Sequence, residues 1–414
     1  MTNLTTNKLK ILNDPIYGLI SIPKTIVFDL IEHPYFQRLR RISQMGLSYL
    51  VYPGAHHSRF HHATGCVYLM NKAVRVLRSK DIEITEPEET ALYIAILLHD
   101  IGHGPFSHAL EHSIVKGVNH EDLSLGYMEL LNEEFEGELT LAIDIFKGNY
   151  HRPFFYQLVS SQLDIDRLDY LKRDSFYSGV AEGSINSDRL IAMMNVVDQQ
   201  LVIEEKGIYS IEKFIVARRL MYWQVYLHKT GVVAENMLVL VLKRAQELIS
   251  QNRLESCPEN LRYFLTQNEG LVINKLLLER FASLDDVDIM FALKLWQNHE
   301  DLVLSRLARG ILNRNLFRIQ LTDEPVTKAE YQKIRDKIKS HFSLNSKQVD
   351  YLIHRGQVKN LAYNNIENKI NLLRKDGSVV DFAMASDPIV SDRIMNETVR
   401  YFICFPKEIN FSTL

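Results

Sequence analysis

Apolar residues recur at intervals of three and four positions over most of the first 250 residues. The pattern is clear in three stretches, "ETALYIAILL" (89–98), "SSQLDIDRLDYLKRD" (160–174) and "EKFIVARRLMYWQVYLHKTGVVAENMLVLVLKRAQELI" (212–249). This spacing is typical of amphipathic helices, and the alternation expected of strands is rare here. Earlier, residues 1–45 contain a turn signal, "NDPIYG", and a helix signal, "FQRLRRI". We therefore predict an extended lead-in followed by a helical bundle with loops, over residues 1–250.

The pattern changes in the last third of the chain. Further helices are predicted over residues 251–312, for example in "DVDIMFALKLWQ" and "DLVLSRLARGIL". Beyond them, "LFRIQL", "KINLLRKDGSVVDFAMA" and "VRYFICFP" resemble strands, with a turn at Lys375-Asp376-Gly377, and "KAEYQKIRDKIKSHF" resembles a helix. The predicted fold class is mainly α, with an N-terminal helical bundle (1–250), a helical extension (251–312) and a small α+β module (313–414).

The composition is that of an ordinary globular protein. Among 414 residues, 46% are hydrophobic and 24% charged, and the net charge is −3. The chain lacks the basic excess of proteins that hold nucleic acid through its phosphates, so we do not expect nucleic acid to be the main partner. Cys66, Cys257 and Cys404 lie far apart, which excludes a disulfide framework or a thiolate zinc finger. With no signal peptide and no apolar run of membrane-spanning length, we expect a cytoplasmic protein that does not enter a membrane.

The histidines are unevenly distributed. Nine of the 15 lie between His56 and His120, and several fall in "LLHDIGHGPFSHALEH" (97–112). Helical spacing places His99 and His103 on one face, and the glycines that follow end the helix there. Imidazole and carboxylate are common ligands of Zn, Fe and Mn, but His99 and Asp100 supply only two contacts. The sequence offers further candidate ligands at His61, His62, Asp164, Asp166, Asp169 and Asp174.

Two stripes at four-residue spacing accompany this cluster. One contains Asp166, Tyr170 and Asp174, and the other contains Arg218, Tyr222 and Tyr226. Each also fits a simpler interpretation, a solvated face for the first and aromatic core contacts for the second. The chain has no GxxxxGK[ST] loop, no GxSxG elbow and no recognisable cysteine nucleophile. A water activated by a metal ion is the simplest nucleophile that remains.

Five motifs together resemble a known family. "QRLRRISQMG", "PGAHHSRFHHATG", "LLHDIGHGPFSHALEH", "NHE" and "DIDRLDYLKRD" occur in the order and spacing found in the HD-domain deoxynucleoside triphosphate triphosphohydrolases, a branch of the HD metal phosphohydrolases. The resemblance covers roughly residues 14–230. It implies a helical HD-domain fold and a divalent ion (Mn, Fe, Zn or Mg) as cofactor. It identifies His62, His99, Asp100 and Asp166 as the metal ligands and makes His61 a structural neighbour.

The resemblance also implies roles around the ion. The catalytic surroundings would be His103, His108, His120 and Glu121, with Glu111 orienting an imidazole. Phosphate clamps would be Arg59, Arg167 and Arg218, for which the guanidinium fork is suited. The sugar pocket would contain Gln44, Met45, Tyr170, Asp174 and Tyr226. Glu32, Gln37 and Arg40 match positions that hold a regulatory nucleotide in some relatives.

Our leading hypothesis is hydrolysis of a dNTP to deoxynucleoside and inorganic triphosphate, by water attack on the α-phosphate. Many relatives carry lysine at the position of Arg167 and histidine at that of Tyr222, and a tyrosine cannot supply the charge of an imidazolium. The same site acting on another phosphate ester, a nucleoside monophosphate, a signalling nucleotide or a nucleic-acid end, is therefore a second hypothesis. A non-catalytic nucleotide-binding assembly module is a third. The resemblance further implies a homo-oligomer, either a dimer or a tetramer.

Overall fold

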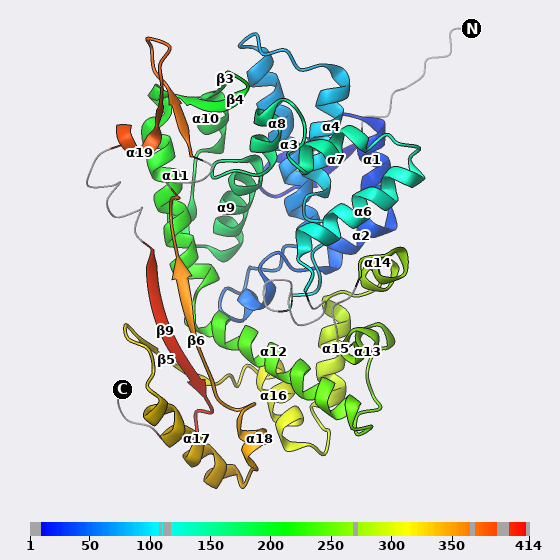
Figure 1. The fold of residues 1–414 in the computed structure, drawn as a ribbon, viewed down its shortest axis with the longest axis vertical. Helices are drawn as coiled ribbons and strands as arrows, with labels where there is room; N and C mark the ends of the chain where they lie inside the picture. The colour runs from blue at the N-terminus through cyan, green and yellow to red at the C-terminus, as the bar shows by residue number, and fades with distance from the viewer. Residues whose placement is uncertain are drawn as a thin grey trace.

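The computed structural model describes residues 10–106, 110, 117–267, 272–364, 369–386 and 397–410. The elements form an elongated molecule, with a helical bundle at one end and a second group of helices and strands at the other (Figure 1). The mainly α fold class predicted from the sequence is confirmed, with small sheets in the C-terminal region.

The helical bundle is formed by the first part of the chain. Its helices are α1 (Thr25–Glu32), α2 (Pro34–Gln37), α3 (Arg59–Arg78), α4 (Glu86–Leu98), α6 (His120–Glu134), α7 (Thr140–Phe146), α8 (Pro153–Val159), α9 (Ile165–Ser178), α10 (Ser187–Ala192) and α11 (Ile208–Met221), with short turns η1 (Arg38–Arg41), η2 (Gly46–Leu50), η3 (Ala181–Gly183) and η4 (Glu205–Gly207). The next helix, α12 (Lys229–Ser250), lies in the second group (Figure 1).

Helix α4 is the centre of this bundle. It begins with a capping box, in which Thr85 accepts the N–H of Glu88 and Glu88 accepts that of Thr85. Every residue from Ala91 to Leu98 is buried, so the helix is enclosed on all sides by its neighbours, among them α3, α7 and α8. A helix that is apolar all round belongs in a core. The end of α4, where His99 follows, is therefore fixed in the interior.

The path from α11 to α12 is interrupted. α11 ends in a π-helical turn, Tyr222–Tyr226 (η5), and α12 begins after His228, which accepts the N–H of Thr230. No single helix in the described part of the chain is long and apolar enough to cross a membrane. One pair, Glu205–Tyr226 with Lys229–Ser250, passes that test by length and composition, with a bend of 56° between its halves.

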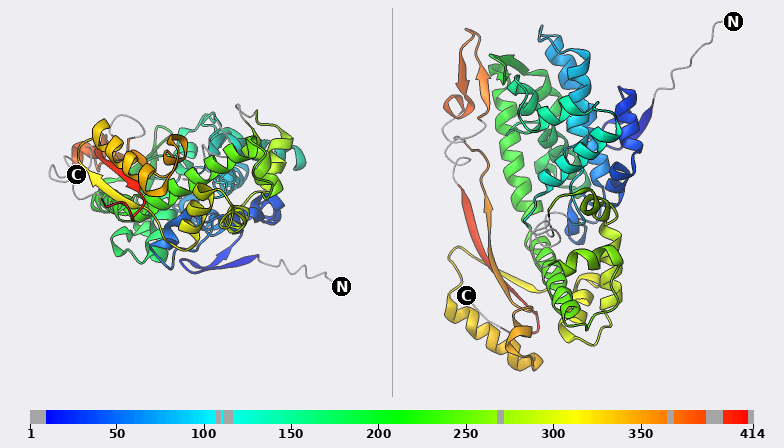
Figure 2. Two further views of the ribbon diagram at one scale, coloured as in Figure 1. Left: turned by 90° about the horizontal axis from the view of Figure 1, so that it is seen from below. Right: turned by 45° about the vertical axis from the view of Figure 1, so that its right-hand side comes forward.

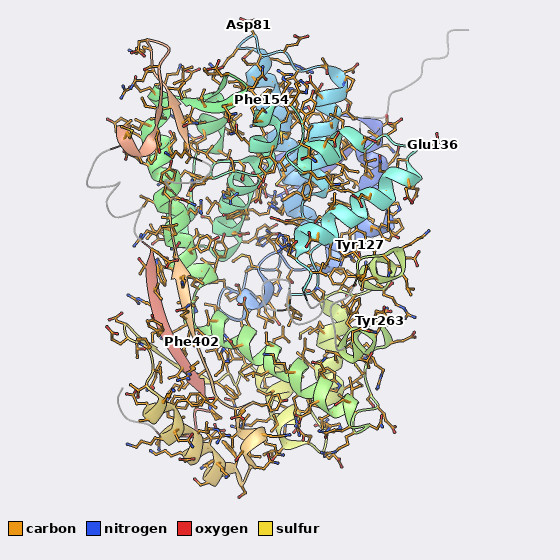
Figure 3. All side chains as sticks on the ribbon, viewed as in Figure 1. Asp81, Tyr127, Glu136, Phe154, Tyr263 and Phe402 are labelled. Atoms are coloured by element: carbon orange, nitrogen blue, oxygen red, sulfur yellow. The ribbon has the colours of Figure 1, made fainter. Side chains whose placement is uncertain are left out.

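The predicted helical extension contains α13 (Glu259–Thr266), α14 (Lys275–Ala282), α15 (Asp286–Trp296) and α16 (Leu302–Leu312). α16 packs on α12, and α14 packs on α6. Tyr127, labelled in Figure 3, lies in α6. It donates a hydrogen bond to the carbonyl of Leu278 in α14, at 2.8 Å. The extension is thus bonded directly to the bundle that carries the histidines.

Among the described residues, strands form three small sheets. β1 (Ile11–Asp14) and β2 (Gly18–Ser21) make a hairpin, β3 (Met194–Val197), β4 (Gln200–Glu204), β7 (Asn371–Leu373) and β8 (Val379–Asp381) make a second sheet in that order, and β5 (Arg318–Thr322), β9 (Thr398–Phe405) and β6 (His354–Asn360) make a third. α17 (Lys328–Phe342), α18 (Ser346–Val349) and α19 (Phe382–Ala385) complete the C-terminal part. The third sheet runs along α11 and α12, away from α1 and α2 (Figure 2).

The sequence missed part of this strand arrangement. The β3–β4 hairpin lies inside the region predicted to be helices and loops, and β7 joins β4 in parallel, so the C-terminal module shares a sheet with the bundle. The turn residues Asp198 and Gln199 both have positive φ, 49° and 60°, which is the conformation of a type I′ turn. Without the usual glycine, this turn gives a weak sequence signal. The predicted turn at residues 375–377 does join β7 to β8.

Candidate active site

Three helix ends bring the predicted metal ligands together. His62 lies in the first turn of α3, His99 and Asp100 follow the last residue of α4, and Asp166 lies in the first turn of α9. The carboxylate of Asp164 caps α9 by accepting the N–H of Arg167 at 2.8 Å. These ends are fixed by packing and capping, so the side chains they carry meet in a set arrangement.

The donor atoms of these four residues surround one point. Nε2 of His62 is 3.1 Å from Oδ1 of Asp166 and 3.7 Å from Oδ2 of Asp100. Nε2 of His99 is 3.4 Å from Oδ1 of Asp100 and 3.6 Å from Oδ1 of Asp166. Ligands bound at about 2.1 Å around a single ion are separated by roughly 3.0–3.4 Å, depending on geometry. The spacing therefore suits one cation among two imidazoles and two carboxylates.

The hydrogen bonds of both rings leave Nε2 for that cation. Nδ1 of His62 donates to Oδ2 of Asp169 at 2.8 Å, and Nδ1 of His99 donates to the carbonyl of Ile96 at 2.7 Å. Nε2 of His99 is buried and makes no hydrogen bond to any described residue. Metal-bound histidines typically donate their other N–H in this way, which fixes the tautomer and the ring orientation. The residues present thus fit a divalent ion.

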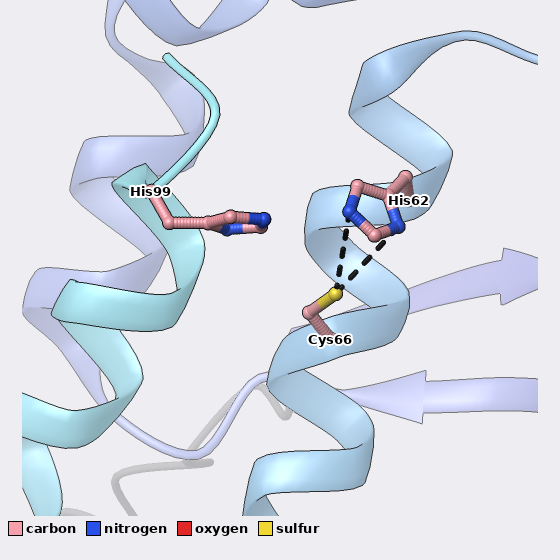
Figure 4. A group of neighbouring side chains, drawn as sticks. All are labelled: His62, Cys66 and His99. Carbon is pink, nitrogen blue, oxygen red and sulfur yellow. Dashed lines mark hydrogen bonds between the residues drawn. The ribbon is translucent and has the colours of Figure 1, made fainter. Parts of the chain in front are cut away.

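Cys66 lies beside the two histidines, and its Sγ is within 4.8 Å of a nitrogen of each ring (Figure 4). The sulfur is 3.7 Å from both ring nitrogens of His62. Because it is equally far from the two nitrogens, it does not lie along the lone pair of Nε2. Burial also raises the pKa of the thiol, and only the thiolate is a good ligand. Asp100 and Asp166 therefore complete the donor set better than Cys66 does.

The carboxylates are held in the ionised form. Burial opposes ionisation of Asp166, but its contacts with His62 and His99 outweigh burial and lower its pKa well below the usual range. Burial likewise opposes ionisation of Asp100, whose pKa is nevertheless lowered by the neighbouring His99, His103 and Arg59. Two buried negative charges at one point favour a cation there.

Further predicted residues adjoin Asp100. Arg59 donates from Nη1 to Oδ2 of Asp100, and Nε2 of His103 is 3.2 Å from Oδ1 of the same residue. The rings of His103 and His120 stack with centroids 4.0 Å apart. Burial and then the Arg59 charge lower the pKa of His103 well below its usual value, which favours the neutral ring. Glu121 is exposed in the first turn of α6.

Two members of the predicted catalytic set, His108 and Glu111, lie outside the described residues.

Residues predicted to bind the sugar gather around Asp174, on the same helix as Asp166. Tyr226 donates its hydroxyl to Oδ2 of Asp174 at 2.8 Å, and Nε2 of His57 is 2.7 Å from Oδ1. The centroid of the Tyr226 ring lies 6.2 Å from that of Tyr170 and 5.2 Å from that of Tyr222. The π-helical turn carries both Tyr222 and Tyr226, and such turns are frequent at functional sites.

Gln44 and Met45 are also buried in this region. The backbone N–H of Gln44 donates to the carbonyl of His57 at 3.0 Å, and its side-chain Oε1 is buried without a hydrogen bond to a described residue. A buried amide oxygen without a donor is costly, which favours a ligand hydroxyl or N–H there.

The other predicted phosphate clamps stand near Tyr170. Arg167 pairs through Nη1 with Asp164, and its Nε is buried without a hydrogen bond to a described residue. Arg218 is half-buried in α11. Both guanidinium groups act electrostatically on the Tyr170 hydroxyl, so both lie on its side of the site.

The predicted regulatory residues lie on the surface near α1. Glu32 and Arg40 are exposed, and Gln37 is half-buried. Arg40 donates to Oε1 of Gln37 at 2.8 Å, and Gln37 donates to the carbonyl of Ile31 at 2.8 Å. Their role as a nucleotide site stays a prediction.

Sequence reasoning missed several residues that support the site. His57 holds Asp174. Its position in the histidine-rich motif was a signal that could have identified it. Asp286 at the start of α15 accepts the N–H of Ser43 at 2.8 Å and that of Phe106 at 2.9 Å. The helical extension thereby holds the loops before Gln44 and after His103. No local pattern indicates this contact, because its partners are separated by 243 and 180 positions.

Comparisons with known proteins identify the family that the chain resembles. The family model described as the HD domain matches residues 59–174, and that of an HD associated region matches residues 185–263. The chain is similar to an uncharacterized protein of Bacillus subtilis, YwfO, with 35% identity over 74% of this chain and 71% of that protein. It is also similar to the deoxynucleoside triphosphate triphosphohydrolase SAMHD1 homolog of Dictyostelium discoideum, with 32% identity over 64% of this chain and about half (54%) of that protein.

Among solved structures, a phosphohydrolase from Bacteroides thetaiotaomicron is similar over the whole molecule. It shares 47% sequence identity and superposes with a TM-score of 0.93 over 96% of this chain and 100% of that chain. The matched HD model covers the candidate ligands and also Asp174, the aspartate predicted to bind the sugar. The chain therefore belongs to the HD-domain family of metal-dependent phosphohydrolases.

Proposed function

We propose that the protein hydrolyses a deoxynucleoside triphosphate to deoxynucleoside and inorganic triphosphate. The observation that carries the proposal is that the tyrosines and the aspartate predicted to bind the sugar gather on and beside the helix that carries a candidate metal ligand. Asp166 and Asp174 are two turns apart on α9, and Tyr226 is bonded to Asp174. A related chain, the Dictyostelium protein, bears the name of this activity.

The proposed reaction uses the chain's own residues in defined roles. A divalent cation held by His62, His99, Asp100 and Asp166 would supply positive charge at the α-phosphate and lower the pKa of water. Arg59, beside Asp100, orients and neutralises phosphate oxygens, and Arg167 and Arg218 hold the rest of the chain of phosphates.

Protons would be moved by the stacked pair His103 and His120. As the oxygen of water bonds to the α-phosphorus, the neutral ring of His103 would accept the proton that the water loses; transfer of a proton to the 5′ oxygen, as its bond to phosphorus breaks, completes hydrolysis. Positioning of the α-phosphate against these groups supplies much of the rate.

The pocket side of the site would select the sugar. One carboxylate oxygen of Asp174 accepts a hydrogen bond from Tyr226, and the other contacts Nε2 of His57. The carboxylate is therefore fixed in place to accept the 3′-hydroxyl. Gln44 has a buried acceptor available nearby, and the bulk of Tyr170 would exclude a 2′-hydroxyl.

The test is incubation of the purified protein with each dNTP and NTP and with Mn²⁺, Fe²⁺ or Mg²⁺, with products separated by ion chromatography. We expect tripolyphosphate and deoxynucleoside in equal amounts, with ribonucleotides hydrolysed far more slowly. Asp166→Asn should lower turnover by at least about 10³-fold, because it removes charge from the donor set. Asp188→Asn, at an exposed ion pair with Lys72, is the matched control and should retain activity.

A different product pattern would contradict the proposal. Orthophosphate or pyrophosphate, with no tripolyphosphate from any dNTP, would favour an HD phosphohydrolase acting on another phosphate ester. The observation that favours this second candidate is Tyr222. Its ring centroid lies 5.2 Å from that of Tyr226, and its side chain carries no positive charge to bind a long phosphate chain. Tight dNTP binding without turnover under every metal would instead favour a nucleotide-binding assembly module.

A further inference from the structure

The β1–β2 hairpin contacts α9, the helix that carries Asp166. Asp14 uses one carboxylate oxygen, Oδ1, to accept the backbone N–H of Ile16 at 2.8 Å and that of Tyr17 at 3.0 Å. Its other oxygen, Oδ2, accepts a hydrogen bond from Nη1 of Arg173 at 2.7 Å. Asp14 therefore shapes its own turn with one oxygen and binds α9 with the other.

Arg173 continues this contact toward the candidate site. Its Nε donates to Oδ2 of Asp169 at 2.9 Å, and its Nη2 donates to Oδ1 of Asp169 at 3.0 Å. Oδ2 of Asp169 in turn accepts the hydrogen bond from Nδ1 of His62 at 2.8 Å. Asp14 is 7% exposed, and Arg173 and Asp169 are 0% exposed. A continuous chain of buried charged groups thus runs from the hairpin to Nδ1 of His62.

Gly65, in α3 three residues after His62, makes room for this chain. A Cβ at that position would lie 2.2 Å from Nη2 of Arg173 and 2.2 Å from Oδ1 of Asp169. Any side chain there would displace the pair. Only glycine lets the guanidinium and the carboxylate lie directly against the helix that carries His62.

We propose that Asp14 is a positioning residue for His62, and that through Arg173 and Asp169 it sets how strongly the site holds a divalent cation. The inference rests on the proposed function only in taking His62 as a ligand. Arg173 lies between two carboxylates, so the charge behind His62 is one positive and two negative. The negative charge of Asp14 keeps Arg173 from drawing Asp169 away from the imidazole of His62. Because Asp169 then accepts the Nδ1–H firmly, Nε2 of His62 becomes a better electron-pair donor to a cation.

The test removes the negative charge of Asp14 and leaves the turn between β1 and β2 in place. Asp14→Asn keeps an oxygen for the N–H groups of Ile16 and Tyr17 but presents an amide to Arg173. Apo protein prepared by chelation is titrated with Co²⁺ alone, and the visible absorption of the bound ion gives its dissociation constant. We expect that constant to rise about 10-fold, the lower end of what loss of an outer-sphere partner costs.

Asp301→Asn is the matched control. Asp301 is also a buried aspartate that accepts a backbone N–H, from Leu304 at 2.9 Å, and binds an arginine, Nε of Arg244 at 3.1 Å, but it lies in the helical extension. Both variants should lower the melting temperature, because each weakens a buried ion pair. Only Asp14→Asn should weaken Co²⁺ binding and move the Nδ1–H proton resonance of His62.

Equal Co²⁺ affinities for wild type and Asp14→Asn would overturn the inference. Failure of the proposed site is a separate result, in which Asp166→Asn binds Co²⁺ as well as wild type does. If Asp14→Asn does not fold, Arg173→Lys serves in its place, since lysine keeps the charge but cannot bind both carboxylates in a planar fork. An unchanged Co²⁺ dissociation constant in Arg173→Lys would likewise contradict the inference.

Discussion

Two buried clusters of ionic groups in this molecule are built alike. In the bundle, Arg173 lies between Asp14 and Asp169. Near the extension, Arg244 in α12 binds Asp301, the N-cap of α16, with Nη2 to Oδ2 at 2.5 Å, and it also binds Glu247. Each cluster joins segments far apart in the chain.

The clusters differ in what lies at their ends. The bundle cluster ends on the imidazole of His62, whereas the Arg244 cluster ends on the hydroxyl of Tyr351, which donates to Glu247 at 2.9 Å. The first arrangement therefore acts on a candidate ligand, and the second ties helices to the C-terminal module. A buried ion pair by itself indicates neither stability nor function, and the residue at its end decides which of the two it serves.

The largest expected effect is on stability at the Arg244 cluster. Arg244→Met leaves Asp301 and Glu247 without their cation, and removing one partner of a buried pair typically costs about 3–5 kcal/mol. We expect a loss near the lower end of that range in denaturant unfolding, because Glu247 is partly exposed. Co²⁺ affinity should not change. A changed affinity would show that the clusters do not act separately.

The second-largest expected effect is on Co²⁺ binding, at the bundle cluster of Asp14, Arg173 and Asp169. Asp169→Asn replaces the acceptor of the His62 Nδ1–H, so we expect Co²⁺ to bind roughly 10–100-fold more weakly. Asp301→Asn, measured in the same titration, is the control. If both variants bind Co²⁺ alike, the contact between Asp169 and His62 is structural only.

A smaller effect is expected on the sugar side. Tyr226→Phe removes the hydroxyl that is bonded to Asp174, and a hydrogen bond to a charged group contributes about 1.5–3 kcal/mol. Because the neighbouring rings remain, we expect KM for a dNTP to rise by about 10-fold, with a smaller change in kcat and in Co²⁺ affinity. Steady-state kinetics on wild type and variant decide this. A fall in kcat at constant KM would place Tyr226 nearer to the reacting atoms.

The smallest effect is a pH dependence outside both clusters. Burial opposes ionisation of Glu88, but hydrogen bonds from Tyr150, Thr85 and Arg152 outweigh it and lower its pKa from 4.5 to about 2. Because the pKa is lower in the folded state, its contribution to stability is full above pH 4.5 and is lost as the pH falls toward 2. Glu88→Gln should cost about 1 kcal/mol at pH 7 and much less at pH 2. Denaturant unfolding at the two pH values measures this, and equal losses at both would contradict it.

Most local elements were predictable from the sequence. The helical periodicity indicated α4, α9, α11 and α12, and the range 328–342 predicted for a helix is that of α17. The turn at residues 375–377 was predictable because glycine marks it. These signals are local, since spacing, capping and turn residues act within a few positions of one another.

Other features depended on contacts that no local pattern contains. The strand β6, "HRGQVKN", has little apolar content and is fixed by pairing with β9, and the β3–β4 hairpin gains β7 from 170 or so positions away. The histidine-rich motifs predicted that a cation site exists, and the resemblance to a family selected four ligands from a larger set of candidates. Composition and spacing alone left those candidates open.

The sequence by itself determined the mainly helical fold class and the presence of imidazoles and carboxylates at helix ends, because helix periodicity and helix-ending residues are written along the chain. Only the tertiary structure decided that Nε2 of His62 and His99 face two carboxylates while Nδ1 of each ring is occupied by a hydrogen bond. It also decided that Asp14, in a turn 48 positions before His62, contributes to that arrangement through Arg173. Hydrogen bonds and ion pairs act over a few ångströms, so which residues share them depends on packing between distant segments rather than on their order in the chain.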